Sequence, residues 1–93
     1  MNKITELLQE AINIVDSHSN DRDKGNERTM KTIVRIFNDI TGHDLTEREG
    51  DIFMVCLKLV RMQRNPNDKD HYVDAVGYLG MAYESQSNEG GMK

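Results

Sequence analysis

Two groups of polar residues, in neighbouring segments of the chain, are best suited to chemistry. Lys58 and Arg61 are separated by three positions, and Asp70, Asp74 and Tyr78 follow one another at steps of four. Residues three or four apart share one face of a helix, so each group would project from one side of its helix. An antiparallel helical hairpin would bring the two faces together as a cluster of two bases, two carboxylates and a phenol.

Two interpretations of this cluster are open. In the first, Lys58 and Arg61 form salt bridges with Asp70 and Asp74 and fix the register of the hairpin, which contributes about 0–1 kcal/mol per exposed bridge. In the second, the bases face a ligand phosphate, and the carboxylates orient them or hold a magnesium ion. Asp51 lies on the same side of its helix, about 10 Å along the axis from Lys58, and is expected to flank the cluster.

The elements that must position these residues are helical, because apolar residues recur at a helical period in four segments. We expect an all-α fold, a compact four-helix bundle. The third helix opens at Thr46, which forms a capping-box pattern with Glu49, and Gly42 is placed to end the second helix in the left-handed conformation. The expected helices cover residues 3–17, 29–41, 46–63 and 69–84.

A long polar segment separates the first two helices. Residues 17–28 contain no large apolar side chain and are rich in turn-forming residues, which predicts a loop of about a dozen residues. Because loops of that length in compact domains are usually functional or disordered, we expect Arg22 and Lys24 to act there as a lid. Residues 1–84 would form a single domain, and the polar, Gly-rich residues 85–93 a flexible tail.

The third helix is expected to form the core of the bundle. Its run from Ile52 to Met62 is apolar nearly all round, so it would pack on several sides, and four short helices cannot cover it completely. We therefore expect a homo-oligomer. Cys56 in this run is expected to be a core thiol. Gly77 and Gly80, inside the fourth helix, suggest close packing against a neighbour, since each costs about 1 kcal/mol of helix propensity.

Composition excludes several classes of function. The net charge is −4 over 93 residues, which argues against duplex nucleic acid as a partner, because binding its backbone requires a basic surface. No stretch approaches the 18 consecutive apolar residues of a membrane span, and a single cysteine fits the reducing cytoplasm. The three histidines have no metal-ligand spacing, so we expect no metal site and no resident cofactor.

Several motifs resemble those of the small bacteriophage domains called nucleotide-modification-associated. The resemblance covers residues 4–84 and implies a bundle distantly similar to the all-α nucleoside-triphosphate pyrophosphatases, acting around nucleotides in the cytoplasm of an infected bacterial host. Where relatives often have tyrosine-glycine after the loop arginine, this chain has Lys24-Gly25. The polar residues shared with the family are Arg22, Lys58, Arg61, Asp70, Asp74 and Tyr78. The motifs that carry the resemblance are Asp21-Arg22, Thr41-Gly42, Leu57-Lys58-Leu59-Val60-Arg61 and Asp70-His71-Tyr72-Val73-Asp74-Ala75-Val76-Gly77-Tyr78.

The leading hypothesis is a phage-type protein that binds a nucleotide or a nucleotide-derived signalling molecule. One concrete form would be a sponge that sequesters a signal of host immunity. Lys58 and Arg61 would contact phosphate, and Tyr78 would lie near the base or ribose. Such a protein would bind its ligand without catalysing a reaction, so we favour a binding protein over an enzyme.

Two alternatives are kept. The first is an enzyme of nucleotide metabolism or modification with magnesium as cofactor. The related pyrophosphatases need a Glu-x-x-Glu pair and a Glu-x-x-Asp pair, whereas this chain offers Glu6 with Glu10 and Asp70 with Asp74, an incomplete set for two metal ions. The second is an adaptor or inhibitor that contacts a host enzyme through exposed apolar surface on the third and fourth helices.

Overall fold

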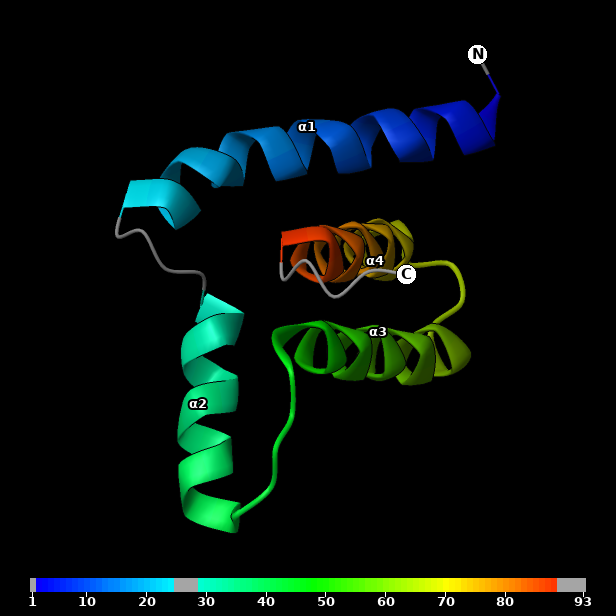
Figure 1. Cartoon of the computed structure of the whole chain (residues 1–93). Helices are drawn as coiled ribbons and strands as arrows, with labels where there is room; N and C mark the ends of the chain where they lie inside the picture. The colour runs from blue at the N-terminus through cyan, green and yellow to red at the C-terminus, as the bar shows by residue number, and fades with distance from the viewer. Residues whose placement is uncertain (1, 25–28, 89–93) are drawn as a thin grey trace.

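Four helices make up the described part of the chain, with no strand among them (Figure 1). The computed structural model describes residues 2–24 and 29–88, with the backbone alone for residues 18–24 and 88. The helices are α1 (Lys3–Lys24), α2 (Thr29–Thr41), α3 (Glu47–Arg64) and α4 (Lys69–Asn88). The expected all-α class is confirmed. No helix in these residues is long and apolar enough to cross a membrane.

The helix ends follow the local signals of the sequence. At the start of α3, the Glu49 backbone N–H donates to Thr46 Oγ1 at 3.1 Å, and the Thr46 backbone N–H donates to Glu49 Oε1 at 2.9 Å, which completes the capping box. After α2, Gly42 adopts a φ of 76°, and its N–H donates to the Asn38 carbonyl at 2.8 Å. Asn2 caps α1 by accepting the Thr5 N–H at 2.8 Å.

Two helices extend further than their sequences predict. The segment expected as a loop is helical as far as Lys24, and α4 continues four residues past the expected end at residue 84, to Asn88. Ser, Asn and Asp are only a few tenths of a kcal/mol poorer than average helix formers, so a helix that is already nucleated and packed can continue through them. In α4 the continuation is also anchored, because Ser85 is buried.

The helices are arranged in three levels, with α4 between α1 and α3 (Figure 1). Helices α3 and α4 form the expected hairpin and pack closely along their lengths. Helix α1 crosses over α4 on the side away from α3, and α2 stands to one side, in contact with the beginning of α3. Helix α4 therefore lies in the middle level, covered by α1 on one side and by α3 on the other.

The core is built on α4 rather than on α3. The buried apolar side chains are only valines and alanines, and among the described residues no Leu, Ile, Phe or Met is fully buried. The prediction that α3 forms the core is wrong, because Phe53 is 68% exposed, Leu59 is half-exposed, and Cys56 is exposed rather than a core thiol. Small side chains on α4 allow α1 and α3 to approach it from opposite sides. The buried apolar residues are Ala11, Val34, Val55, Val73, Ala75 and Ala82.

Among the described glycines, the one with the least room for a side chain is one that the sequence did not single out. A Cβ added at Gly50 of α3 would clash with Met30 Sδ of α2 and lie 2.9 Å from Val34 Cγ1. Around Gly77 the nearest side-chain atom would be 3.8 Å away, and around Gly80 no atom lies within 4 Å. The expected close packing of these two glycines is therefore wrong within the described chain. They border a cleft instead.

Candidate functional site

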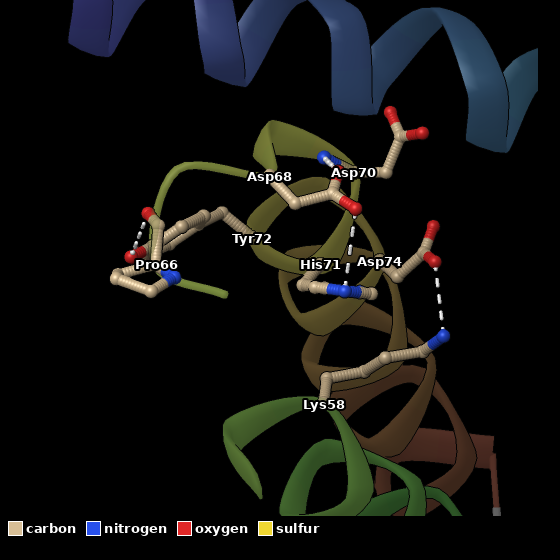
Figure 2. Close-up of polar contacts among 7 residues, drawn as sticks. All are labelled: Lys58, Pro66, Asp68, Asp70, His71, Tyr72 and Asp74. Carbon is tan, nitrogen blue, oxygen red and sulfur yellow. Dashed lines mark hydrogen bonds and ion pairs between the residues drawn. The ribbon is translucent and has the colours of Figure 1, made fainter. Parts of the chain in front are cut away.

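The predicted cluster contains one ion pair between the two helices of the hairpin. Lys58 Nζ of α3 lies 3.1 Å from Asp74 Oδ2 of α4, and Figure 2 shows the lysine reaching across to the aspartate. The Lys58 side chain is 11% exposed and the Asp74 side chain 38%. A lysine that is nearly covered requires such a partner. The pair therefore fixes the hairpin register and leaves part of the Asp74 carboxylate accessible.

The other predicted members of the cluster are more loosely placed. Arg61 is exposed one turn further along α3, and Asp70 is exposed at the start of α4, with its carboxylate directed toward α1 (Figure 2). In the described part of the chain, neither forms an ion pair. Tyr78 is half-buried one turn beyond Asp74. The structure thus joins Lys58 to Asp74 directly and leaves Arg61 available to a ligand.

The expected lid takes a different form. Arg22 and Lys24 belong to the last turns of α1 rather than to a loop. Their side chains lie outside the described residues, and so does Gly25. A contact between these bases and the cluster stays a prediction.

The beginning of α4 is fixed by contacts within the turn that precedes it (Figure 2). The Tyr72 hydroxyl donates to the Pro66 carbonyl at 2.9 Å, and His71 Nε2 lies 3.4 Å from Asp68 Oδ2. Asp68 Oδ1 also accepts the Asp70 backbone N–H at 3.1 Å. These bonds hold the first turn of α4 in place and therefore help to position Asp74, which follows in the next turn.

A second ion pair links α1 to α4. Lys69 Nζ lies 2.8 Å from Glu10 Oε1. The hydrogen bond to Glu10, followed by the charge of Glu10, raises the pKa of Lys69 above 10.5, and the nearby carboxylates of Glu6 and Asp70 act in the same direction. The pair ties the crossing of α1 over α4 close to the cluster.

A cleft runs between α1 and α4. It consists of a cavity of about 640 Å³ and a smaller one of about 170 Å³. The two cavities share Ala11, Val15, Gly77 and Met81 in their linings, so they adjoin each other where α1 crosses α4. Because Gly77 and Gly80 carry no side chains, the floor of the cleft stays open.

The two ends of the cleft differ in chemistry. The smaller end includes Asp74 and Tyr78 of the predicted cluster, among apolar residues such as Ile14 and Val73. The larger end is lined mainly by aliphatic side chains of α1 and α4, such as Leu8 and Ile12, together with the carboxylates of Asp16 and Glu84. Sequence reasoning did not identify the apolar end. The feature of the sequence that could have indicated this cavity is the pair of glycines in α4, Gly77 and Gly80, which bring no side chain to the space beside α1.

Two buried polar residues mark the far end of the hairpin. Asp51 is 1% exposed and Ser85 2% exposed, and each interacts with another group. The sequence placed Asp51 on the cluster side of α3 as a flank, and its burial confirms that this side of α3 faces into the protein. The importance of Ser85 was missed, because a serine in a polar terminal segment carries no sign of burial.

The carboxylates that could hold a metal do not converge. Glu6 and Glu10 on α1 and Asp70 and Asp74 on α4 are the candidates, but Glu10 binds Lys69 and Asp74 binds Lys58. Among the described side chains, those of residues 2–17 and 29–87, no three from Asp, Glu, His or Cys come together as a metal-binding group.

An all-α fold with a hairpin and a cleft along its central helix defines a small helical domain whose accessible chemistry lies between α1 and α4. The chain belongs to a family described as a domain of unknown function, DUF6378, whose model matches residues 6–86. No curated protein and no solved structure gives a significant match. The match includes most or all of each of the four helices and every residue of the predicted cluster.

Proposed function

We propose that this protein binds a nucleotide or a nucleotide-derived signalling molecule in the cleft between α1 and α4. The observation that carries the proposal is the change in chemistry between two adjoining cavities, from a mainly aliphatic one of about 640 Å³ to a smaller one that includes Asp74 and Tyr78. Cavities of about 300–1,000 Å³ suit small organic ligands. A ligand with a flat ring at one end and hydroxyl and phosphate groups at the other matches this change.

Each end of the cleft has a distinct role in this proposal. The apolar end accepts the base, and the carboxylates of Asp16 and Glu84 there can accept hydrogen bonds from ring amino groups. At the polar end, Asp74 and Tyr78 can bond the ribose hydroxyls. Lys58 neutralises Asp74, which lowers the repulsion of a nearby phosphate, and Arg61 supplies the charge-assisted contact to that phosphate.

The proposal is for binding rather than turnover. Two of the four candidate carboxylates are already engaged by lysines, at Glu10 and Asp74. Magnesium would enter only with the alternative of an enzyme of nucleotide metabolism. Robust magnesium-dependent release of pyrophosphate from nucleoside triphosphates, lost in Asp74→Asn, would establish that alternative instead.

Calorimetric titration with nucleotides and cyclic dinucleotides tests the proposal. Removal of a charge-assisted contact to phosphate should weaken binding by about 1.5–3 kcal/mol, or about 10- to 150-fold. Arg61→Ala should show this loss with an unchanged melting temperature, since Arg61 forms no ion pair within the described chain. Arg64→Ala, an exposed arginine one turn away, is the matched control and should bind normally.

Lys58→Ala separates binding from a purely structural role. It should lower both the affinity and the melting temperature, because Lys58 also holds Asp74. If no nucleotide binds the wild type and Lys58→Ala only melts earlier, the cluster serves the hairpin alone and the proposal fails. If binding is found, sequestration of a host signal by a phage-type protein is the concrete form that we propose.

Exposed apolar side chains favour a second candidate, an adaptor that binds a host protein. Phe53, Leu59 and Val60 on α3 and Leu79 and Tyr83 on α4 are all at least 46% exposed. Such residues on a monomer surface are typical of protein interfaces. A host protein that copurifies with the wild type and is lost in Phe53→Ser, with nucleotide binding unaffected, would support this candidate.

A further inference from the structure

Helix α2 directs its clearest apolar stripe away from the rest of the chain. Ile33, Ile36, Phe37 and Ile40 are each between 39% and 78% exposed. They are spaced at three, one and three residues, so they form one stripe along the helix. The adjoining side of α2 makes the close contact with Gly50 of α3, through Met30 and Val34.

The single chain leaves more surface exposed than a compact monomer does. Its accessible surface is 6835 Å². A compact monomer of 10.7 kDa is expected to expose about 5,500 Å², so the excess is about 1,300 Å². A stable protein interface covers about 800 Å² on each partner. The excess is therefore large enough for one such interface, and the large apolar residues are on the surface to form it.

We propose that the α2 stripe packs antiparallel against the α2 stripe of a second copy of this chain, in a two-fold symmetric dimer. The spacing of the stripe reads the same in both directions along the chain. In an antiparallel pair, Ile33 meets the partner's Ile40, and Ile36 meets the partner's Phe37. One surface is thus complementary to itself, which is the requirement of a two-fold interface.

The antiparallel direction follows from the position of α3. Helix α3 contacts the first half of α2, at Met30 and Val34. Antiparallel pairing therefore places the two chain bodies at opposite ends of the interface, where they do not collide.

Sedimentation equilibrium of the full chain provides the test. The wild type should have twice the 10.7 kDa monomer mass at tens of micromolar. Ile36→Glu should reduce the mass to that of one chain, because a charge would be buried at the centre of the interface. Leu79→Glu on α4 is the matched control, since Leu79 and Ile36 are each 50% exposed, and it should remain dimeric. Far-UV circular dichroism of each variant checks that it is helical.

A charge-pair rescue tests the register and does not depend on the folding of one variant alone. Ile36→Glu and Phe37→Lys should each be monomeric, and their equimolar mixture should recover the dimer mass, because position 36 faces the partner's position 37. The melting temperature of the wild type should also rise with concentration. A wild-type monomer, a dimeric Ile36→Glu, a monomeric Leu79→Glu or a mixture without recovery would each overturn the proposal. Only a foreign protein that binds the stripe of a monomeric wild type would reassign it as an adaptor surface.

Discussion

Helices α2 and α4 reverse the usual relation between sequence pattern and burial. Helix α2 has a sharply segregated apolar face, yet only Val34 of this helix is fully buried. Helix α4 has mixed polarity and two internal glycines, yet it carries Val73, Ala75, Ala82 and Ser85 of the core. A helix whose apolar residues all lie on one face is expected to be buried on that face alone. A helix with small residues on several faces suits a position covered on two sides. In the proposed dimer, the segregated face of α2 would meet its main apolar partner in a second copy of the chain.

The largest effect is expected where α2 meets α3. Gly50→Val would place two methyl groups where even a Cβ clashes with Met30 and lies 2.9 Å from Val34 Cγ1. Overpacking of this kind typically costs about 1–3 kcal/mol, and we expect the upper part of that range in urea unfolding. Gly50→Ala should cost less, because Met30 is flexible and can move. A normal stability for Gly50→Val would mean that α2 is not held against α3 as the structure describes.

Truncations in the two helices should differ in how they respond to concentration. Val73→Ala removes two methyl groups from a side chain that is 2% exposed, and it should lower the unfolding free energy by about 2 kcal/mol. That loss should be equal at protein concentrations of about 2 µM and about 200 µM, a range that spans the dissociation constant of a weak dimer. Ile40→Ala, at a residue 78% exposed in the chain, should destabilise only at the higher concentration. Equal behaviour of both variants would remove the distinction between α2 and α4.

Local signals in the sequence predicted much of the fold. The four helices, the capping box at Thr46 and the left-handed Gly42 follow from interactions between residues close in the chain, so one sequence suffices to identify them. The contact between Lys58 and Asp74 also followed from helical spacing and a short connection. The end of α1 did not, because weak helix formers such as Ser and Asn lie near the balance point between helix and loop.

The arrangement of the helices depended on information that periodicity does not contain. The apolar pattern of α3 was interpreted as that of the core helix. Which helix lies between two others depends on how closely its neighbours can approach it, and the small side chains of α4 allow α1 and α3 to approach from opposite sides. The cleft was missed for a related reason, since it arises where Gly77 and Gly80 bring no side chain to the space beside α1. The sequence also predicted that Arg61 and Asp70 would join the Lys58–Asp74 pair. The structure does not bring them to it, because both side chains are exposed to solvent.

A smaller effect, of opposite sign, is expected from the glycines of α4. Gly80→Ala meets no atom within 4 Å and should stabilise the protein by about 0.5–1 kcal/mol through helix propensity. Because Gly80 lines the larger end of the cleft, the same variant should lower the affinity for the proposed ligand. Gly42→Ala is the control, since it also has room but sits at a φ of 76°, and it should destabilise. A destabilised Gly80→Ala would show that a neighbour covers this glycine in solution.

The smallest effect concerns the link between α1 and α4, and it should depend on pH. The hydrogen bond to Glu10 and the Glu10 charge raise the pKa of Lys69 above 10.5, so protonated Lys69 favours the folded state. For a raised pKa, the stabilisation is fully present below the unfolded value and disappears as the pH rises through the folded one. Glu10→Gln should therefore melt slightly earlier than the wild type at pH 8, and the gap should close above pH 10.5 as Lys69 loses its proton. Lys69→Met, which removes the other partner, should show a gap of the same sign that closes over the same range, because the wild type itself loses the charged pair there. Thermal melts at low salt across this range measure the effect, since exposed pairs are screened by salt. A gap for Glu10→Gln that is constant from pH 8 to pH 11 would indicate that Glu10 stabilises the crossing of α1 over α4 by packing rather than through the charge of Lys69.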